Sequence, residues 1–172
     1  MLMRFITIPR QNSLPSETLL PTIWLYILMG SLLLSFSCSE EEKFTGRQVV
    51  YTLQAVSAAY DYEGTATFKE LDRGVEITIQ LSGNKGESAH YFPAHLHYGA
   101  YGATDAPMAA MLSPVDLRTL KSVTVVESLA SGESFNFEDV ADFDGHVKVH
   151  LADDGPDYHI ILVAGNIGKN KP

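Results

Sequence analysis

An all-β sandwich behind an N-terminal signal segment is the fold that this sequence predicts. Short segments rich in β-branched and aromatic residues recur along most of the chain, and turn-forming residues such as Gly83-Asn84-Lys85-Gly86 separate them. No helical periodicity persists over more than about two turns. The length of 172 residues and the apolar fraction of 45% fit one globular domain.

The chain begins with a segment typical of an export signal. Residues 22–37 (TIWLYILMGSLLLSFS) are apolar and uncharged, a stretch that is short for a membrane span but right for the core of a signal peptide. Arg4 and Arg10 supply the positive charge that precedes such a core. We therefore expect residues 1–37 to be a cleaved signal peptide.

The only cysteine of the sequence, Cys38, follows this core directly. A lone cysteine in an exported protein has no disulfide partner within its chain. Its position resembles the lipid-bearing cysteine of bacterial lipoproteins, although Ser35 stands where an aliphatic residue is usual. We expect a lipid on Cys38, a tether over residues 38–46 and anchoring in the cell envelope, at the outer membrane. The alternative is an ordinary secretory signal with an incidental free thiol.

The β-sandwich domain is expected over residues 47–172, with seven short strands, a number typical of a sandwich. These strands are Gln48–Ala55, Gly64–Lys69, Val75–Leu81, His95–Tyr98, Ser122–Glu127, His146–Leu151 and Tyr158–Ala164. Two segments, Pro114–Leu120 and Phe137–Asp142, are candidates for single short helices. Met108 and Met111, set among alanine and leucine, are expected to fill the core.

The charge of the domain excludes one class of partner. Removal of residues 1–37 leaves 10 basic and 20 acidic residues, a formal charge of −10. Such a surface repels phosphate backbones, and no basic stripe or aromatic-basic cluster occurs in the sequence. We therefore expect no nucleic-acid partner. The expected contact is with the membrane, through the lipid, and the sequence identifies no protein partner.

A pair of histidines, His95 and His97, carries the chemical interest of the sequence. On a strand, residues i and i+2 project from one face roughly 6 to 7 Å apart, a span that one metal ion can bridge. Alternation along residues 146–151 places His150 on the outer face of another strand, which makes it the natural third ligand. Three imidazoles suit copper, which intrinsic affinity favours, or zinc as the alternative.

The remaining histidines are expected to face solvent. They are His90, His146 and His159, and each is an alternative fourth ligand that would close the metal site.

Several motifs resemble, in order, segments of the Cu,Zn superoxide dismutase family between residues 50 and 168. The resemblance covers the second and third strands (64–68 and 74–83), the first two copper ligands (His95-x-His97), the strand with the last copper histidine (147–150) and the closing strand (164–168). It implies an eight-stranded Greek-key sandwich with His95, His97 and His150 as copper ligands. The pattern is also similar to the CHRD-type domains of exported bacterial proteins.

The sequence departs from the dismutase pattern where catalysis is concerned. No histidine occurs between His97 and His146, so the zinc site of that family has no counterpart. Ile161 stands near the place of the arginine that attracts superoxide, and Ala164 stands at the place of a disulfide cysteine. Superoxide dismutase activity is therefore disfavoured.

Three hypotheses follow from these residues. The preferred one is an exported, lipid-anchored domain that binds copper through His95, His97 and His150 with weak or no catalysis. The alternatives are a metal-free surface interaction module and a copper superoxide dismutase that has lost zinc.

Overall fold

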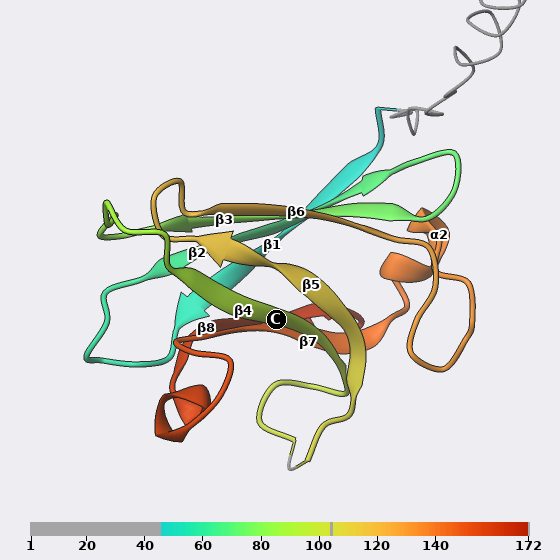
Figure 1. Ribbon diagram of the computed structural model, residues 1–172. Coiled ribbons are helices and arrows are strands. Elements are labelled where there is room, and N and C mark those ends of the chain that lie inside the picture. Colours follow the sequence, from blue (N-terminus) through green and yellow to red (C-terminus); the bar gives the residue numbers. More distant parts are fainter. Residues whose placement is uncertain (1–45, 104, 172) are drawn as a thin grey trace, which may run out of the picture. The chain divides into compact units, whose positions relative to one another are not determined.

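Eight antiparallel β-strands close into one barrel-like sheet, which confirms the predicted all-β class (Figure 1). The computed structural model describes residues 46–103 and 105–171, so the predicted signal, Cys38 and most of the tether lie outside the described residues. The elements are β1 (Gln48–Ala55), β2 (Glu63–Glu70), β3 (Val75–Ser82), β4 (Tyr91–Tyr98), β5 (Met108–Asp116), β6 (Lys121–Val126), α2 (Phe137–Val140), β7 (Asp144–His150), the 3₁₀ turn η1 (Pro156–His159) and β8 (Ile161–Gly168).

The strands follow one another around the barrel in the order β1-β2-β3-β6-β5-β4-β7-β8. Pairing is extensive at most junctions but sparse at two of them. Strands β5 and β6 share the single registered pair Asp116 and Lys121, and β8 meets β1 through two pairs. The sheet therefore has two thin seams.

Inward-facing apolar side chains fill the barrel. Phe68, Ile79, Leu96 and Val147 are each completely buried, and their neighbours along each strand point the other way. Full burial of such a side chain stabilises the fold by about 1.5–3 kcal/mol. The inward-facing residues predicted from the alternation are therefore confirmed as the core.

Two predicted elements were wrong in type or extent. Strand β5 was missed, and the predicted helix 114–120 is instead the end of β5 followed by a turn. Pro114 is tolerated because it lies where the β4–β5 register shifts between Phe92 and Ala94, so it has no registered partner on β4. The strand predicted over 158–164 begins only at Ile161, because η1 occupies the preceding residues.

The predicted short helix at 137–142 forms as α2, and a capping box holds its first turn. The Asn136 backbone N–H donates to Asp139 Oδ2 at 2.8 Å, which satisfies one of the donors at the helix start. Among the described residues, no helix is long and apolar enough to cross a membrane.

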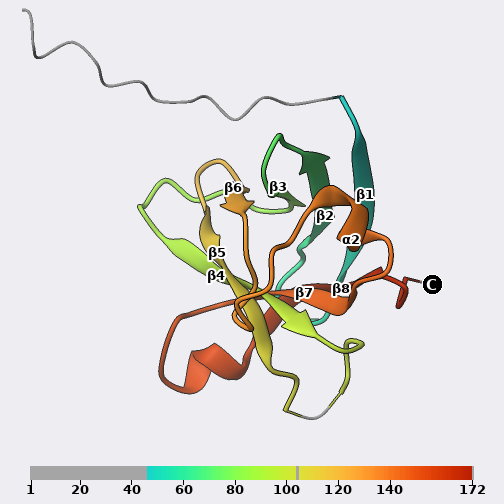
Figure 2. The ribbon, with the colours of Figure 1, turned by 90° about the vertical axis from the view of Figure 1, so that its right-hand side faces the viewer.

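Two loops matter for the site because both extend from the same side of the sheet (Figures 1 and 2). One joins β4 to β5 through residues 99–107, and the other joins β7 to β8 and contains η1. They flank the paired strands β4 and β7, on which four histidines lie.

Candidate metal centre

Strands β4 and β7 pair side by side and bring the predicted ligands together. In their antiparallel register His95 lies opposite Lys148, and His97 lies opposite His146. His150 is two residues beyond Lys148 on the same face, so it is the diagonal neighbour of His95. The alternation that keeps Leu96 and Val147 inside the barrel places these side chains on its outer face.

The three predicted ligands form a compact group. One ligand-capable nitrogen from each of His95, His97 and His150 lies within 4.8 Å of the other two. The ring centres of His95 and His150 are 5.2 Å apart, and those of His95 and His97 are 5.8 Å apart. The structure therefore gathers all three in a group that could hold a metal ion.

Backbone carbonyls fix the orientation of two of these rings. His97 Nδ1 lies 3.0 Å from the carbonyl oxygen of Ala106, and His150 Nδ1 lies 2.8 Å from that of Tyr158. A carbonyl oxygen only accepts, so each Nδ1 carries the proton and each Nε2 keeps its lone pair. This is how metal-binding histidines are ordinarily held, with one nitrogen on the metal and the other on an oriented acceptor.

Each ring of the group has one buried nitrogen without a hydrogen-bond partner among the described residues. Buried atoms without a hydrogen bond include His95 Nδ1, His97 Nε2 and His150 Nε2. Leaving a buried polar atom unpaired costs about 1–3 kcal/mol. Three such atoms in one place fit a shared metal ion, which would accept all three lone pairs.

Burial lowers the pKa of each of these histidines. For His95 the pKa falls to about 4, chiefly through desolvation and then through the nearby His150, His97 and Lys148. Desolvation is also the largest cause for His97 and for His150. The rings are therefore neutral near pH 7, which is the state that binds a metal ion.

The three predicted ligands lie on the outer face of their strands but are nevertheless buried. His95, His97 and His150 are between 5% and 8% exposed, because the loops that follow β4 and β7 cover the outer face of the strands. Alternation predicted the face correctly but could not predict the cover. The exposed positions of His90 and His159 agree with the expectation.

His146, expected at the surface, is completely buried. Its ring stacks on His97 with centres 5.1 Å apart, and its Nδ1 donates to the Gly99 carbonyl oxygen at 2.7 Å. Tyr101 lies edge-on to the His146 ring, with ring centres 5.8 Å apart. His146 Nε2 is also buried without a hydrogen-bond partner, but the group of three potential ligands does not include His146, which packs against His97.

Two features near the site were not anticipated from the sequence. Lys148 projects between His146 and His150, half-buried, and its positive charge lowers the pKa of the neighbouring rings. Tyr158 stacks flat on His150, with centres 4.7 Å apart and planes within 3°. The regular alternation of residues 146–150 could have placed Lys148 on the same face as the histidines. No local sequence pattern indicates that Tyr158 packs on His150.

The methionines are also placed differently from the expectation. Met111 is 71% exposed and Met108 is 37% exposed, so neither fills the core. Both lie on β5, the strand that pairs with β4 beside the histidines.

No protein-family model matches the chain, and no curated protein matches it. The chemistry of the site is therefore argued from its own geometry.

Proposed function

We propose that this domain binds a single copper ion through His95 Nδ1, His97 Nε2 and His150 Nε2, with weak or no catalysis. One observation carries the proposal: the neutral rings of His95, His97 and His150 each offer a ligand nitrogen within 4.8 Å of the other two, and each ring has a buried nitrogen without a hydrogen-bond partner. Pure packing gives no reason to gather three unpaired acceptors in one place, because their lone pairs gain nothing from one another.

Copper is preferred because the intrinsic affinity of imidazole sites for divalent metals is highest for copper. Zinc is the alternative, since three protein ligands with an open fourth position also suit it. The described residues contain no other group of three such side chains, so they offer no second site like the zinc centre of the dismutase family. This supports binding or storage over rapid turnover.

Lys148 favours the zinc-less dismutase as a second candidate. Its ammonium lies on the same outer face as the cluster and opposite His95, where a positive charge would attract a small anion. The metal-free surface module is the remaining alternative. It requires that the unpaired histidine nitrogens bind no metal ion.

For the fold, we propose the Greek-key sandwich of the superoxide dismutase or CHRD type. The two thin seams divide the strands into β1-β2-β3-β6 and β5-β4-β7-β8, each a four-stranded antiparallel group. The chain passes between the groups from β3 to β4, from β5 to β6 and from β6 to β7. These exchanges support the resemblance noted in the motifs.

For the cellular location, we propose export and attachment to the outer membrane through a lipid on Cys38. The apolar core at residues 22–37 and the position of the single cysteine support this. Mass spectrometry of Cys38 in the wild type and in Cys38→Ser tests it, and an unmodified thiol would refute the anchor.

Isothermal titration with copper tests the metal proposal. The protein is compared with a His95→Ala/His97→Ala variant and with a matched His90→Ala/His159→Ala control, in which both altered residues are exposed. We expect one tight equivalent in the wild type and the control and none in the cluster variant. Equal binding in all three would refute the site, and fast superoxide dismutation by the loaded protein would favour the second candidate.

A further inference from the structure

The two exposed methionines stand directly beside the histidine cluster. In the register of β4 with β5, Met111 lies opposite His95 and Met108 lies opposite His97. Directly opposed residues on neighbouring strands have Cβ atoms about 4.5–5.5 Å apart and share a face of the sheet. The thioethers therefore occupy the outer face next to two of the three proposed ligands.

A break in the strand register makes this arrangement possible. Residues three apart on a regular strand point to opposite faces, so Met108 and Met111 would not both face outward. The register shifts between Leu96 and His97, where Ala109 is the extra residue on β5. Ala109 is buried and both methionines are exposed, so the irregularity turns the two sulfur-bearing chains to one side.

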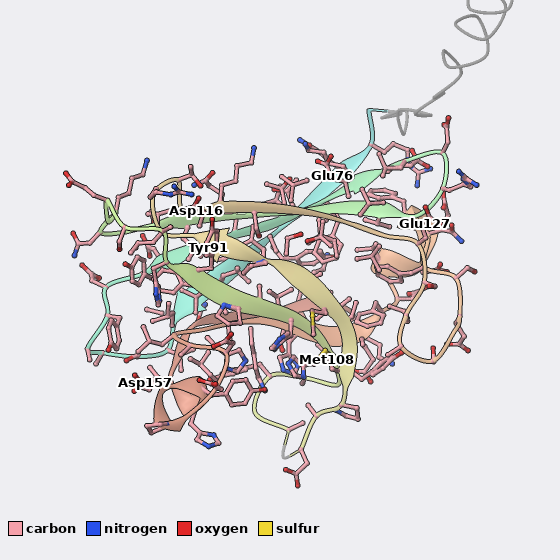
Figure 3. The ribbon with its side chains drawn as sticks, viewed as in Figure 1. Glu76, Tyr91, Met108, Asp116, Glu127 and Asp157 are labelled. Carbon is pink, nitrogen blue, oxygen red and sulfur yellow. The ribbon has the colours of Figure 1, made fainter. Side chains whose placement is uncertain are left out.

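The methionines line a groove of about 520 Å³ that reaches the histidine cluster. Its walls include Tyr91, His95, Asp153 and Tyr158. Figure 3 shows Tyr91 and Met108 at opposite ends of the paired strands β4 and β5, along which the groove runs. Because His95 is a member of the cluster and Tyr158 stacks on His150, the groove and the cluster share a wall.

Thioether sulfur is a soft, uncharged ligand that favours monovalent copper over hard divalent ions. We propose that Met108 and Met111 form a solvent-facing site that takes up Cu(I) and passes it to the histidine cluster. This inference rests on the proposed copper function of the cluster. The carboxylate of Asp153 in the groove wall adds a negative charge that attracts the cation.

The transfer is a ligand exchange without change of oxidation state. Copper–sulfur bonds to the two thioethers break as copper–nitrogen bonds form to the imidazoles, and the metal remains Cu(I) throughout. No proton has to leave His97 or His150, because each ring keeps its proton on Nδ1, which donates to a backbone carbonyl oxygen, and Nε2 carries the lone pair for the metal.

The sequence makes a sulfur-specific test possible. After residue 37 the only sulfur atoms belong to Cys38, Met108 and Met111, so a Cys38→Ser background leaves the two methionines. The processed chain, residues 38–172, in this background is compared with Met108→Leu/Met111→Leu, which keeps size and apolar character, and with His97→Ala/His150→Ala. Each is loaded with Cu(I) and studied by X-ray absorption and by competition with a coloured Cu(I) chelator.

With one equivalent of Cu(I) we expect a copper–sulfur shell in the histidine variant. In the background protein, where the metal passes to the histidines, we expect that shell once a second equivalent is added. The leucine variant should show no sulfur shell at either loading and should bind the second equivalent at least about tenfold more weakly, while it still binds Cu(II) at the histidines. Absence of sulfur scattering in the histidine variant, or its persistence in the leucine variant, would overturn the methionine site. If the histidine substitutions leave Cu(II) binding unchanged while sulfur scattering is retained, only the proposed function of the cluster is overturned.

Discussion

Acid should destabilise the metal-free domain through His95 in particular. The pKa of this residue is 6.5 in an unfolded chain and about 4 in the folded domain. The unfolded chain therefore takes up the proton first, and stability falls as the pH falls from 6.5 towards 4. Above pH 6.5 the residue is neutral in both states and contributes no pH dependence.

The size of the effect follows from the same two values. At pH 5 the unfolded histidine is almost fully protonated and the folded one almost fully neutral. This pH lies about 1.5 units below the unfolded pKa of 6.5. At about 1.4 kcal/mol per unit, His95 alone should remove about 2 kcal/mol of unfolding free energy between pH 7 and pH 5. Desolvation of the other cluster histidines adds to the loss in the same direction.

Urea unfolding at pH 7 and pH 5, with a strong chelator present, measures this loss. A His95→Gln variant, which cannot titrate, should lose about 2 kcal/mol less than the wild type over this interval. The matched control is His90→Gln, which removes an exposed histidine that lies outside the cluster. An identical pH dependence in wild type and His95→Gln would refute the claim that burial holds His95 neutral.

Three further outcomes are expected. Copper at a hundredfold excess over its Kd should raise the unfolding free energy by about 2.7 kcal/mol, seen as a higher Tm in calorimetry, and no shift would argue against binding to the folded state. Tyr158→Leu should weaken copper binding about tenfold without changing its stoichiometry, because it removes the ring that stacks on His150; unchanged affinity in a titration would deny Tyr158 a positioning role. Gly165→Ala should cost about 1–3 kcal/mol in urea unfolding, because a Cβ there collides with the backbone carbonyl oxygen of Thr52; a stability equal to that of the wild type would show that β1 and β8 can separate at their seam.

Much of the barrel was predictable because its strands alternate regularly. The residues from Val75 to Leu81 and from His146 to His150 show a strict two-residue period, and both form strands with the expected inner faces. Strand β5 was missed because its register shift at Ala109 and its proline at 114 interrupt that period. Irregular strands carry no simple periodic signal.

The candidate site was predictable to the level of three residue numbers. The i, i+2 spacing of His95 and His97 and the outer-face position of His150 were sufficient, because strand pairing brought these faces together. The burial of the rings was not predictable, since it depends on loop residues such as Ala106 and Tyr158 whose positions follow from tertiary structure. Their backbone carbonyls orient the rings. Because every residue has a backbone carbonyl, the sequence does not indicate which ones will do so.

Electron paramagnetic resonance of the Cu(II)-loaded protein tests the central claim most directly, because nitrogen ligands split the copper signal. We expect a single copper species whose coupling shows three imidazole nitrogens, and we expect His97→Ala to lose one of them or the species itself. A spectrum of unbound copper, or one that is identical in the wild type and in His97→Ala, would contradict the account.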